Sequence, residues 1–394
     1  MSEKLRLLAT AAFGLEGIAA SELKRLGFEA KGFHGGASFT GSYEDAFLAN
    51  LWLRSADRVL IELGRFRAES FEALFEGVKA LPLEDYLPRD AFLHLTASCA
   101  RSTLMAPSSV QSIAKKAAAA RLQGVYQIGW LPETGPRYRL DVHIHEDEAV
   151  VALDTSGPGL SRRGYRTFNA VAPLRESLAA AMVMTSPWRP WLPFFDPMCG
   201  SGTLPIEAAF IALDRAPGLL RPFAMEEWPA CDKAACQRLR EEAAERFEAK
   251  KAERQASPEP LRVQGSDIDA SVLNMALTHL RQAGLTGLVR FEKRELKDAQ
   301  NPFGEERGTV VTNPPYGERM GDEAQAEGIY QELRMLHNRL PGWGFSVISS
   351  HKGFERVFGK RADKKRRVYN GRIECEIFNY FPPRAPKEQP GEDG

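Results

Sequence analysis

The chain has 394 residues, which is enough for two or three domains with cores of their own. Its 52 basic and 52 acidic side chains cancel, so the molecule as a whole is not a basic clamp for nucleic acid. The five cysteines are an odd number without the spacing of zinc ligands, which argues against a disulfide framework or a metal site and favours a reducing cytoplasm.

The first residues predict the start of a small α+β domain. Residues 1–4 lack the apolar core of a signal peptide, and no later stretch is long and apolar enough to span a bilayer. We therefore expect a cytoplasmic protein without a membrane partner. A short strand is expected over 7–10, and a helix should begin near Gly14 and run to Leu26.

Alternating apolar residues predict an α+β region of about 150 residues, an ordinary domain size. The strands are expected over 59–66, 91–97, 137–144 and 149–153, and the helices over 70–80 and 109–120. His143 and His145 alternate along one strand, a spacing more typical of surface or packing residues than of metal ligands. Basic side chains gather near the second helix, at Arg101, Lys115 and Lys116, and the same pattern is typical of a solvated helix face.

A glycine turn follows an apolar strand in the middle of the chain. Leu192, Phe194 and Phe195 lead into the turn 196–203, and a helix with apolar spacing begins at once. Glycines let a backbone approach a ligand closely, and the helix offers free N–H groups. The turn lacks the Gly-Lys-Ser/Thr of a P-loop, and Asp196 would repel a phosphate. A ligand with a cationic amine or sulfonium fits better.

A second acidic strand end follows the mixed-charge helix expected over 238–254. The strand that begins at Val263 ends in Asp267, and a helix is expected over Ala270–Ala283. Asp267 is our choice for binding ribose hydroxyls, with Asp269 as the alternative or as the helix N-cap. Both acids would serve equally well as plain helix caps.

A third strand, 288–291, precedes a loop that carries Glu295. An acid at this place often binds an adenine amino group. The usual residue is an aspartate after a small residue, so the pair Arg294-Glu295 departs from that pattern.

Asn313-Pro314-Pro315-Tyr316 follows the apolar strand 309–312. Proline has no N–H to donate, so the two prolines end the strand ladder and stiffen the turn. The side chain of Asn313 and the carbonyl of Pro314 can accept both hydrogens of a ring amine, while Tyr316 stacks on the ring. Two such acceptors would stabilise the positive charge on the amine as it attacks an electrophile. Alone, the tetrapeptide is more typical of a proline-terminated strand.

The C-terminal region predicts a hairpin. Its strands are expected over 367–369 and 372–378, joined by the turn dipeptide Asn370-Gly371. A basic run precedes it and would lie beside the sheet's rim, either steering phosphates or forming an ordinary exposed loop.

The order of these motifs, each separated by helical sequence, predicts a doubly wound parallel α/β sheet. The chain here resembles the class I S-adenosyl-L-methionine-dependent methyltransferases that act on exocyclic amines of nucleobases. The resemblance implies a Rossmann-like domain with S-adenosyl-L-methionine as cofactor, and 313–316 as its catalytic loop. The implied cofactor-binding residues are Asp196, Pro197, Cys199, Gly200, Ser201, Gly202, Thr203, Asp267, Ile268 and Glu295.

The segments before this domain extend the resemblance. The stretches 154–157, 160–166 and 172–179 are similar to the junction in THUMP-domain RNA methyltransferases, nearest to the bacterial 23S ribosomal RNA guanine-N2 enzymes, including the N-terminal half of a fused two-enzyme form. The similarity covers nearly the whole chain to about Pro383. It implies four regions: a ferredoxin-like segment over 1–60, a THUMP domain over 61–155, a methyltransferase domain over 156–383 and a disordered tail over 384–394.

The resemblance implies that the chain methylates N2 of a guanosine in RNA, with ribosomal RNA as its partner. A tRNA guanine-N2 enzyme, a DNA adenine-N6 enzyme and a non-catalytic RNA-binding assembly factor stay open as alternatives. The sequence does not settle the oligomeric state or the nucleotide. The expected RNA-binding residues are Arg101, Lys115, Lys116, Arg162, Arg163, Arg166, Lys364, Lys365, Arg366 and Arg367.

Overall fold

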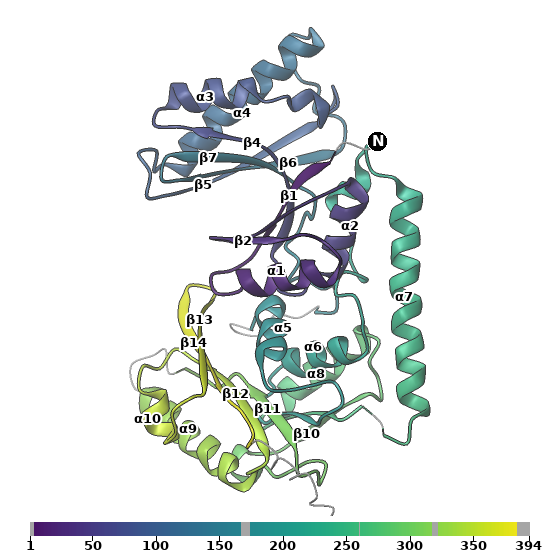
Figure 1. Ribbon diagram of the computed structural model, residues 1–394, viewed down its shortest axis with the longest axis vertical. Helices are drawn as coiled ribbons and strands as arrows, with labels where there is room; N and C mark the ends of the chain where they lie inside the picture. Colours follow the sequence, from purple (N-terminus) through teal and green to yellow (C-terminus); the bar gives the residue numbers. More distant parts are fainter. Residues whose placement is uncertain (1–3, 167–173, 260, 317–321, 384–394) are drawn as a thin grey trace, which may run out of the picture. The chain divides into compact units, whose positions relative to one another are not determined.

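The computed structural model describes residues 4–166, 174–259, 261–316 and 322–383 (Figure 1). The chain divides into two compact units. The first unit holds residues Met1–Gly164 with Ala216–Glu245, and the second holds Tyr165–Arg215 with Arg246–Gly394. The tail predicted over 384–394 lies outside the described residues. Among those that are described, no helix combines the length and the apolar character needed to cross a membrane.

The first unit is built on one seven-stranded sheet with the strand order β2-β3-β1-β4-β7-β6-β5. Among its described strands, only β5 and β6 run parallel to each other. The strands are β1 Leu5–Thr10, β2 Lys31–Phe33, β3 Gly36–Gly41, β4 Arg58–Arg67, β5 Phe92–Ala100, β6 Arg137–His145 and β7 Glu148–Asp154. The helices are α1 Glu16–Arg25, α2 Tyr43–Trp52, α3 Phe71–Ala80 and α4 Pro107–Tyr126. Every strand and helix predicted in this part is present, although α4 extends six residues beyond the predicted end at 120.

Side chains alternate across the sheet of the first unit. On β6, Tyr138, Leu140 and Val142 are buried, while Arg139 and Asp141 are half-buried on the other face. The buried set joins one core with the four helices, and Figure 1 shows α3 and α4 along β4 to β7. The opposite face carries a small apolar cluster made by strand residues alone. One face of this sheet thus packs against the four helices, and among the described residues of this unit the other face carries no helix.

The segment Ala216–Glu245 packs on this first unit, although the sequence placed it inside the methyltransferase region. Its short helix η2, Ala224–Glu227, is followed by Trp228, which stacks on Tyr138 with ring centroids 4.9 Å apart. Helix α7, Lys233–Ala256, then buries Cys236 and Ala243 against the same core. The sequence predicted a solvated helix here. In the structure Cys236, the partly buried Leu239 and Ala243 follow each other at three and four residues, so they form one apolar stripe along the helix.

The second unit contains a seven-stranded sheet in the order β10-β9-β8-β11-β12-β14-β13. The first five strands in this order pair in parallel, whereas β14 is antiparallel to both of its neighbours, β12 and β13. This confirms the predicted doubly wound α/β fold. The strands are β8 Phe194–Asp196, β9 Val263–Asp267, β10 Val289–Lys293, β11 Gly308–Thr312, β12 Trp343–Ser349, β13 Lys364–Asn370 and β14 Ile373–Tyr380. The helices are α5 Glu176–Thr185, α6 Thr203–Ala212, α8 Ala270–Gln282, α9 Asp322–Arg339 and α10 Phe354–Phe358, with η3 at Leu296–Asp298.

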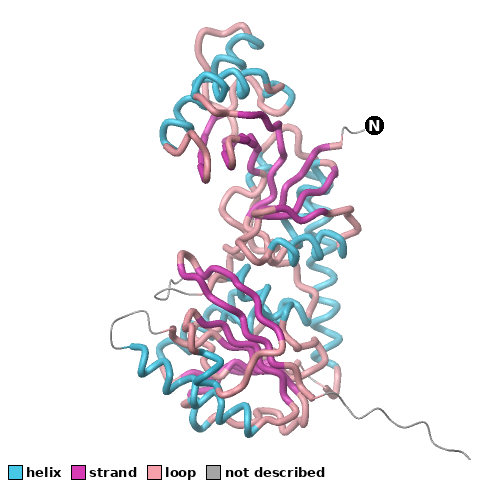
Figure 2. The backbone as a smooth tube through the Cα atoms, turned by 60° about the vertical axis from the view of Figure 1, so that its left-hand side comes forward, coloured by secondary structure: helices cyan, strands magenta, loops and turns pink. Residues whose placement is uncertain are grey.

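Helices cover both faces of this second sheet. Figures 1 and 2 show α5, α6 and α8 on one side, and α9 and α10 on the other. On the α9 side, Tyr330 and Leu333 pack with Val310 and Phe345 of the central strands. Both faces of β11 and β12 are therefore buried, which is why these strands read as continuous apolar runs.

The C-terminal hairpin is present, with its turn one residue later than predicted. Asn370 pairs with Ile373, so Gly371 and Arg372 form the turn, and Gly371 has a φ of +66°. The basic run does not precede the hairpin as predicted. It lies inside edge strand β13, because pairing with β14 begins at Lys364.

Candidate active site

The two motifs that define the site lie at neighbouring strand ends. Strands β8 and β11 pair in parallel, with Phe194 opposite Thr309 and Phe195 opposite Val310. Since the carboxyl ends of parallel strands meet at one edge of a sheet, the turn after Asp196 and the loop that begins at Asn313 emerge side by side. The structure thus brings the predicted cofactor turn and the predicted catalytic loop together.

A buried hydrogen bond joins these two segments. The Thr312 hydroxyl donates to Asp196 Oδ1 at 2.7 Å, and the backbone N–H of Met198 donates to the same oxygen at 3.2 Å. Asp196 is only 1% exposed, and this burial raises the pKa of its carboxyl group to about 7. Asp196 does not offer its charge to the open side of the site. It holds the turn and the loop in register.

Backbone bonds fix the glycine turn between β8 and α6. Cys199 N–H donates to the carbonyl of Ser266 at 2.9 Å, and Gly200 N–H donates to Asp267 Oδ2 at 2.9 Å. His279 of α8 lies with Nδ1 3.1 Å from the carbonyl of Ser201. The turn is therefore tied to β9 and α8 as well as to β11.

The glycines of the turn have different roles. Gly202 has a φ of +84°, and a Cβ there would lie 2.8 Å from the Phe291 ring. A Cβ at Gly200 would meet only Val272, at 4.0 Å, so the backbone is open on that side. An accessible backbone at the start of a helix, beside a strand-end acid, fits a cofactor that carries an amino-acid group and a ribose.

Asp267 and Asp269, at the end of β9, have different positions, although the sequence left both open as ribose-binding acids or helix caps. Asp269 is the N-cap of α8 and accepts from Ser271 N–H at 2.7 Å. Asp267 sits at the strand end and accepts from Gly200 and Asp269. Ile268, between them, is 60% exposed, which is unusual for an isoleucine and places an apolar surface beside the turn.

Glu295 lies beyond β10 and contacts none of the turn residues through a hydrogen bond or ion pair that the structure describes. Its carboxylate pairs with Lys297 Nζ at 2.5 Å, and the side chain is half exposed. The neighbouring Arg294 N–H donates to the carbonyl of Asp267 at 3.0 Å. This bond keeps the loop after β10 beside the strand-end acid.

In the catalytic loop, the tyrosine folds back on the asparagine. The Tyr316 hydroxyl donates to Asn313 Oδ1, and burial raises the pKa of this hydroxyl well above its usual range. Pro314 is buried and Pro315 is exposed. The hydroxyl of Tyr330, on α9, donates to the carbonyl of Pro315 at 3.3 Å and so ties the loop to α9. In this arrangement, one acceptor position of Asn313 is engaged.

Two of the predicted RNA-binding arginines have structural roles instead. Arg163 is 1% exposed, and its guanidinium donates to the carbonyls of Leu160 and Arg54, so its charge does not reach a surface ligand. The prediction for Arg163 is therefore corrected. Arg166 is largely buried and donates to Thr203 Oγ1, at the first residue of α6. It belongs to the support of the cofactor turn.

The other predicted basic residues are on the surface, in two separate groups. Arg101, Lys115, Lys116 and Arg162 are exposed in the first unit, where Lys115 pairs with Glu133 at 3.2 Å. The β13 group in the second unit consists of Lys364, Lys365, Arg366 and Arg367. Of these, Lys365 pairs with Glu355 at 3.0 Å and Arg367 with Glu374 at 2.6 Å.

Three residues that support the site were missed in the sequence-based prediction. Thr312 was read only as the end of an apolar strand, and Tyr330 and His279 were not singled out. Thr312 carried a usable signal, because a threonine directly before the loop places a hydroxyl at the strand end. Tyr330 and His279 carried none, because only the packing of α9 and α8 brings them to the loops.

Three family models match consecutive parts of the chain. They are the RlmL ferredoxin-like domain over residues 6–60, the THUMP domain over 68–154 and the RMKL-like methyltransferase domain over 163–379. The chain belongs to the RMKL-like methyltransferase family.

Two relatives match over nearly the whole of this RMKL-like methyltransferase. The putative RNA methyltransferase YpsC of Bacillus subtilis (strain 168) is 36% identical over 393 residues, which are 99% of this chain and 100% of YpsC. The ribosomal RNA large subunit methyltransferase K/L of Syntrophotalea carbinolica is 37% identical over 391 residues, which are 96% of this chain and 54% of that longer protein.

Two solved structures have the same fold over their full length. SMU.472, a putative methyltransferase complexed with SAH, is 37% identical with a TM-score of 0.89, over 98% of this chain and 100% of that one. A predicted N6-adenine-specific DNA methylase from Listeria monocytogenes is 41% identical with a TM-score of 0.88, over 97% of each chain. The cofactor of the RMKL-like methyltransferase is S-adenosyl-L-methionine, and the open turn at Gly200 fits it.

The two acids after β9 can be separated by mutation. Asp267→Ala should weaken binding of S-adenosyl-L-methionine about tenfold or more, because it removes both the strand-end acid and the bond to Gly200. Asp269→Ala is the matched control, and should lower the free energy of unfolding by about 1 kcal/mol, the usual loss for an N-cap, without changing affinity. Titration calorimetry and thermal unfolding measure the two effects. Equal affinity losses in both variants would contradict the assignment.

The raised pKa of Asp196 predicts a pH dependence of stability. The native carboxyl group keeps its proton up to about pH 7, whereas the unfolded chain releases it near the ordinary value of 3.8. Its contribution to the free energy of unfolding should therefore fall as the pH rises from about 4 to 7 and be constant above, by on the order of 4 kcal/mol at most.

Asp196→Asn keeps an acceptor for Thr312 but cannot ionise. The difference in unfolding free energy between this variant and the parent chain, measured by denaturant titration from pH 4 to 8, should follow that curve. A difference that does not change with pH would show that the carboxyl group is not held neutral.

Proposed function

We propose that the chain transfers the methyl group of S-adenosyl-L-methionine to the exocyclic N2 of a guanosine in RNA, with large-subunit ribosomal RNA as the substrate. The observation that carries the proposal is the pairing of β8 with β11, which sets Asn313 beside the cofactor turn through the bond from Thr312 to Asp196. The name of the K/L relative supports ribosomal RNA, and that of YpsC supports RNA in general.

In this proposal the catalytic loop binds and orients the amine. S-adenosyl-L-methionine, when bound, supplies a methyl group on a positively charged sulfur. Asn313 Oδ1 and the carbonyl of Pro314 accept the hydrogens of N2 and direct its lone pair toward the cofactor turn. The same acceptors stabilise the positive charge that grows on the amine, so the rate gain comes from orientation and polarisation. No dedicated base is assigned, because the methylated amine is itself a strong acid before it loses its proton.

The tyrosine must rearrange for this geometry to be complete. Its hydroxyl now donates to the oxygen of Asn313 that would accept from the guanine. Entry of the base would replace one donor at Asn313 with another and free the tyrosine ring to stack on the purine, which has been turned out of its helix. The exchange leaves Asn313 with a hydrogen-bond partner in both states.

The direct test is to identify the modified nucleoside. Purified chain and methyl-labelled S-adenosyl-L-methionine are incubated in three separate reactions, one each with the ribosomal RNA, the tRNA and the DNA of cells that lack the gene. Nucleosides are then analysed by mass spectrometry. Labelled N2-methylguanosine from ribosomal RNA supports the proposal.

Each other product would change the conclusion in its own way. The same nucleoside from tRNA alone would move the substrate from ribosomal RNA to tRNA. N6-methyl-2′-deoxyadenosine from DNA would overturn the proposal and agree with the name of the Listeria monocytogenes protein, a predicted N6-adenine-specific DNA methylase. Bound cofactor without any product would indicate a non-catalytic protein.

Asn313→Ala should lower the rate of a single turnover about 100-fold or more, because one acceptor for the amine is lost. RNA affinity should stay within about twofold, since Asn313 is one contact among many. Asn274→Ala, an exposed asparagine of α8 in the same unit, is the matched control. A near-normal rate for the Asn313 variant would remove this residue from the mechanism.

Ring and hydroxyl of Tyr316 can be tested separately. Tyr316→Phe keeps the stacking ring and removes the hydroxyl, with its bond to Asn313 and its contacts to Asn370 and Cys375, so turnover should change less than about threefold. Tyr316→Ala removes the ring and should reduce kcat/KM roughly tenfold or more, as expected when a base loses an aromatic partner. If the phenylalanine variant is as defective as the alanine variant, the hydroxyl rather than the ring is required.

A further inference from the structure

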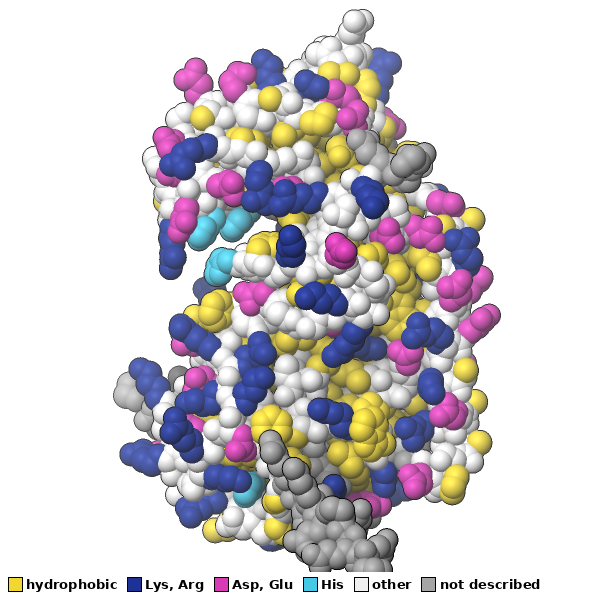
Figure 3. Space-filling view, in the orientation of Figure 1, with side chains coloured by type: hydrophobic (Ala, Val, Ile, Leu, Met, Phe, Trp, Pro, Cys, Tyr) yellow, Lys and Arg dark blue, Asp and Glu magenta, His cyan; other side chains and the backbone are white. Residues whose placement is uncertain are grey.

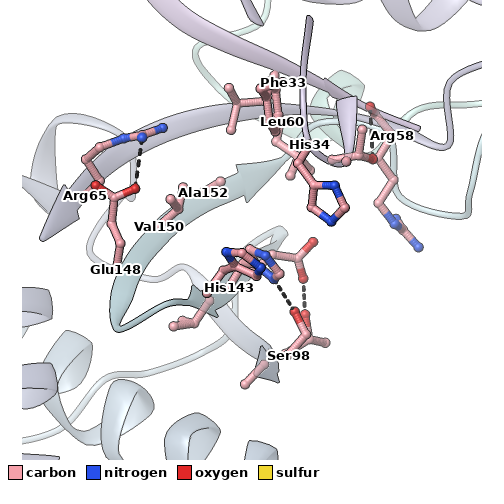
Figure 4. A pocket seen from close by; sticks show the side chains of 18 of the residues that line it. Phe33, His34, Arg58, Leu60, Arg65, Ser98, His143, Glu148, Val150 and Ala152 are labelled. Carbon is pink, nitrogen blue, oxygen red and sulfur yellow. Dashed lines mark hydrogen bonds and ion pairs between the residues drawn. The ribbon is translucent and has the colours of Figure 1, made fainter. Parts of the chain in front are cut away.

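A large hollow in the first unit lies on the uncovered face of its sheet, apart from the methyltransferase motifs. It has a volume of about 470 Å³ and is lined by residues of β1, β4, β5, β6 and β7 and of the turn between β2 and β3. Figure 4 shows His34 reaching into it from one wall and His143 from the opposite one. The ferredoxin-like and THUMP parts of the sheet build this hollow together.

The floor of the hollow is apolar. Leu8, Leu60 and Ala152 come from three neighbouring strands and are 5%, 6% and 2% exposed, with Val150 packed against them. All four of these residues belong to strands. An apolar surface of this kind on a sheet is suited to a flat, uncharged group.

Rings form the walls. The His34 and His145 rings have centroids 5.7 Å apart, and the His143 and His145 rings lie 6.3 Å apart and nearly parallel, at 12°. Phe33, at the rim, is 41% exposed. Figure 3 shows histidine side chains gathered where the first unit is hollowed. Each of these planar groups offers a face to a flat ligand, and the described residues hold no cluster that could bind a metal ion.

The arginines that line the hollow already have acidic partners. Arg65 contacts Glu148 at 3.1 Å, drawn as a dashed line in Figure 4, and Arg139 contacts Asp141 at 2.9 Å. Arg58 pairs with the buried Asp154. An isolated phosphate would have to compete with these carboxylates for the arginines. The hollow is thus better matched to a neutral ligand with hydrogen-bonding edges.

The state of His143 agrees with a neutral ligand. The side chain of His143 is exposed on the sheet face, yet partial desolvation, with the neighbouring His145 and His34, lowers the pKa of this histidine and so favours its uncharged form. Its Nδ1 lies 2.8 Å from Ser98 Oγ, which fixes the ring plane. An uncharged ring held at a fixed angle is a stacking surface.

We propose that this hollow binds the unstacked base of one nucleotide in a single-stranded segment of the RNA substrate. Aromatic and imidazole rings over an apolar floor are how proteins hold unpaired bases, and the volume matches one nucleotide. The inference rests on the proposed RNA activity and adds a second contact to it, in a unit that does no chemistry. The base lies on the apolar floor beside the rings of His34 and His143, with Thr96 and Ser98 lining the same hollow.

The test uses the full chain and a fluorescein-labelled 12-nucleotide single-stranded RNA of mixed sequence that contains one 4-thiouridine. Anisotropy titrations compare the parent chain with His34→Ala and His143→Ala. Each variant should raise Kd roughly tenfold, the loss typical of one stacking partner. His94→Ala is the matched control, since His94 lies on neighbouring β5 but does not line the hollow, and its Kd should not change.

Photocrosslinking provides the second readout. Irradiation should attach the thiouridine to the peptides that contain Phe33 and His34 or His143, and the two alanine variants should lose the crosslink. Unchanged affinity in both variants would overturn the site. Crosslinks confined to other peptides would also overturn it, and would mean that the hollow binds a protein partner or no ligand. A duplex of the same sequence that binds as tightly as the single strand would overturn the choice of an unpaired base.

Failure of the hollow and failure of the proposed function give different results. If the parent chain makes N2-methylguanosine in RNA and the histidine variants bind RNA normally, the activity stands and the hollow is refuted. If the chain makes no such product but the variants lose affinity for the oligonucleotide, the hollow stands and the activity is refuted.

Discussion

The active site depends on the parallel pairing of β8 with β11. This pairing brings Thr312 within 2.7 Å of Asp196, and both partners are buried. A hydroxyl that donates to a buried carboxyl group satisfies a polar atom that would otherwise be costly, so neither loop can shift alone without leaving it unpaired. The turn after Asp196 and the loop that begins at Asn313, more than 100 residues apart in the chain, are thereby held together, and the proposed orientation of the amine rests on this link.

The sequence predicted what local signals encode. Apolar runs located β8 and β11, the helix predicted over 70–80 begins beside its N-cap Ser70, Asp269 caps α8 as one of the two predicted readings had it, and the glycines marked the turn before α6. The predictions were less accurate where pairing decides. The hairpin turn moved by one residue because the register of β13 and β14 is set over seven pairs, which outweigh the preference of one dipeptide.

Long-range packing explains the remaining differences. Arg163 looked like a surface cation, but its five donors are satisfied in part by the carbonyls of Leu160 and Arg54, which no local pattern reveals. The segment before α7 could not be assigned to the first unit from sequence, because Trp228 stacks on a tyrosine 90 residues earlier. For the same reason the fold-back of Tyr316 on Asn313 was not foreseen. A motif defines which groups are present, and the surrounding helices decide which of them are paired.

The balance of charge fits this picture of paired groups. Many of the basic side chains that face outward have an acidic partner within 4 Å, including Lys115, Lys365 and Arg367. Exposed pairs of this kind contribute little to stability, yet each one reduces the free positive charge that could attract phosphates. This pairing lowers the share that long-range attraction to phosphates can have in binding a nucleic acid, so the proposed contacts to unpaired bases gain weight. The two proposed contacts, rings over an apolar floor in the first unit and a stiff acceptor loop in the second, are surfaces of that type, and in both proposals the base must first leave its helix.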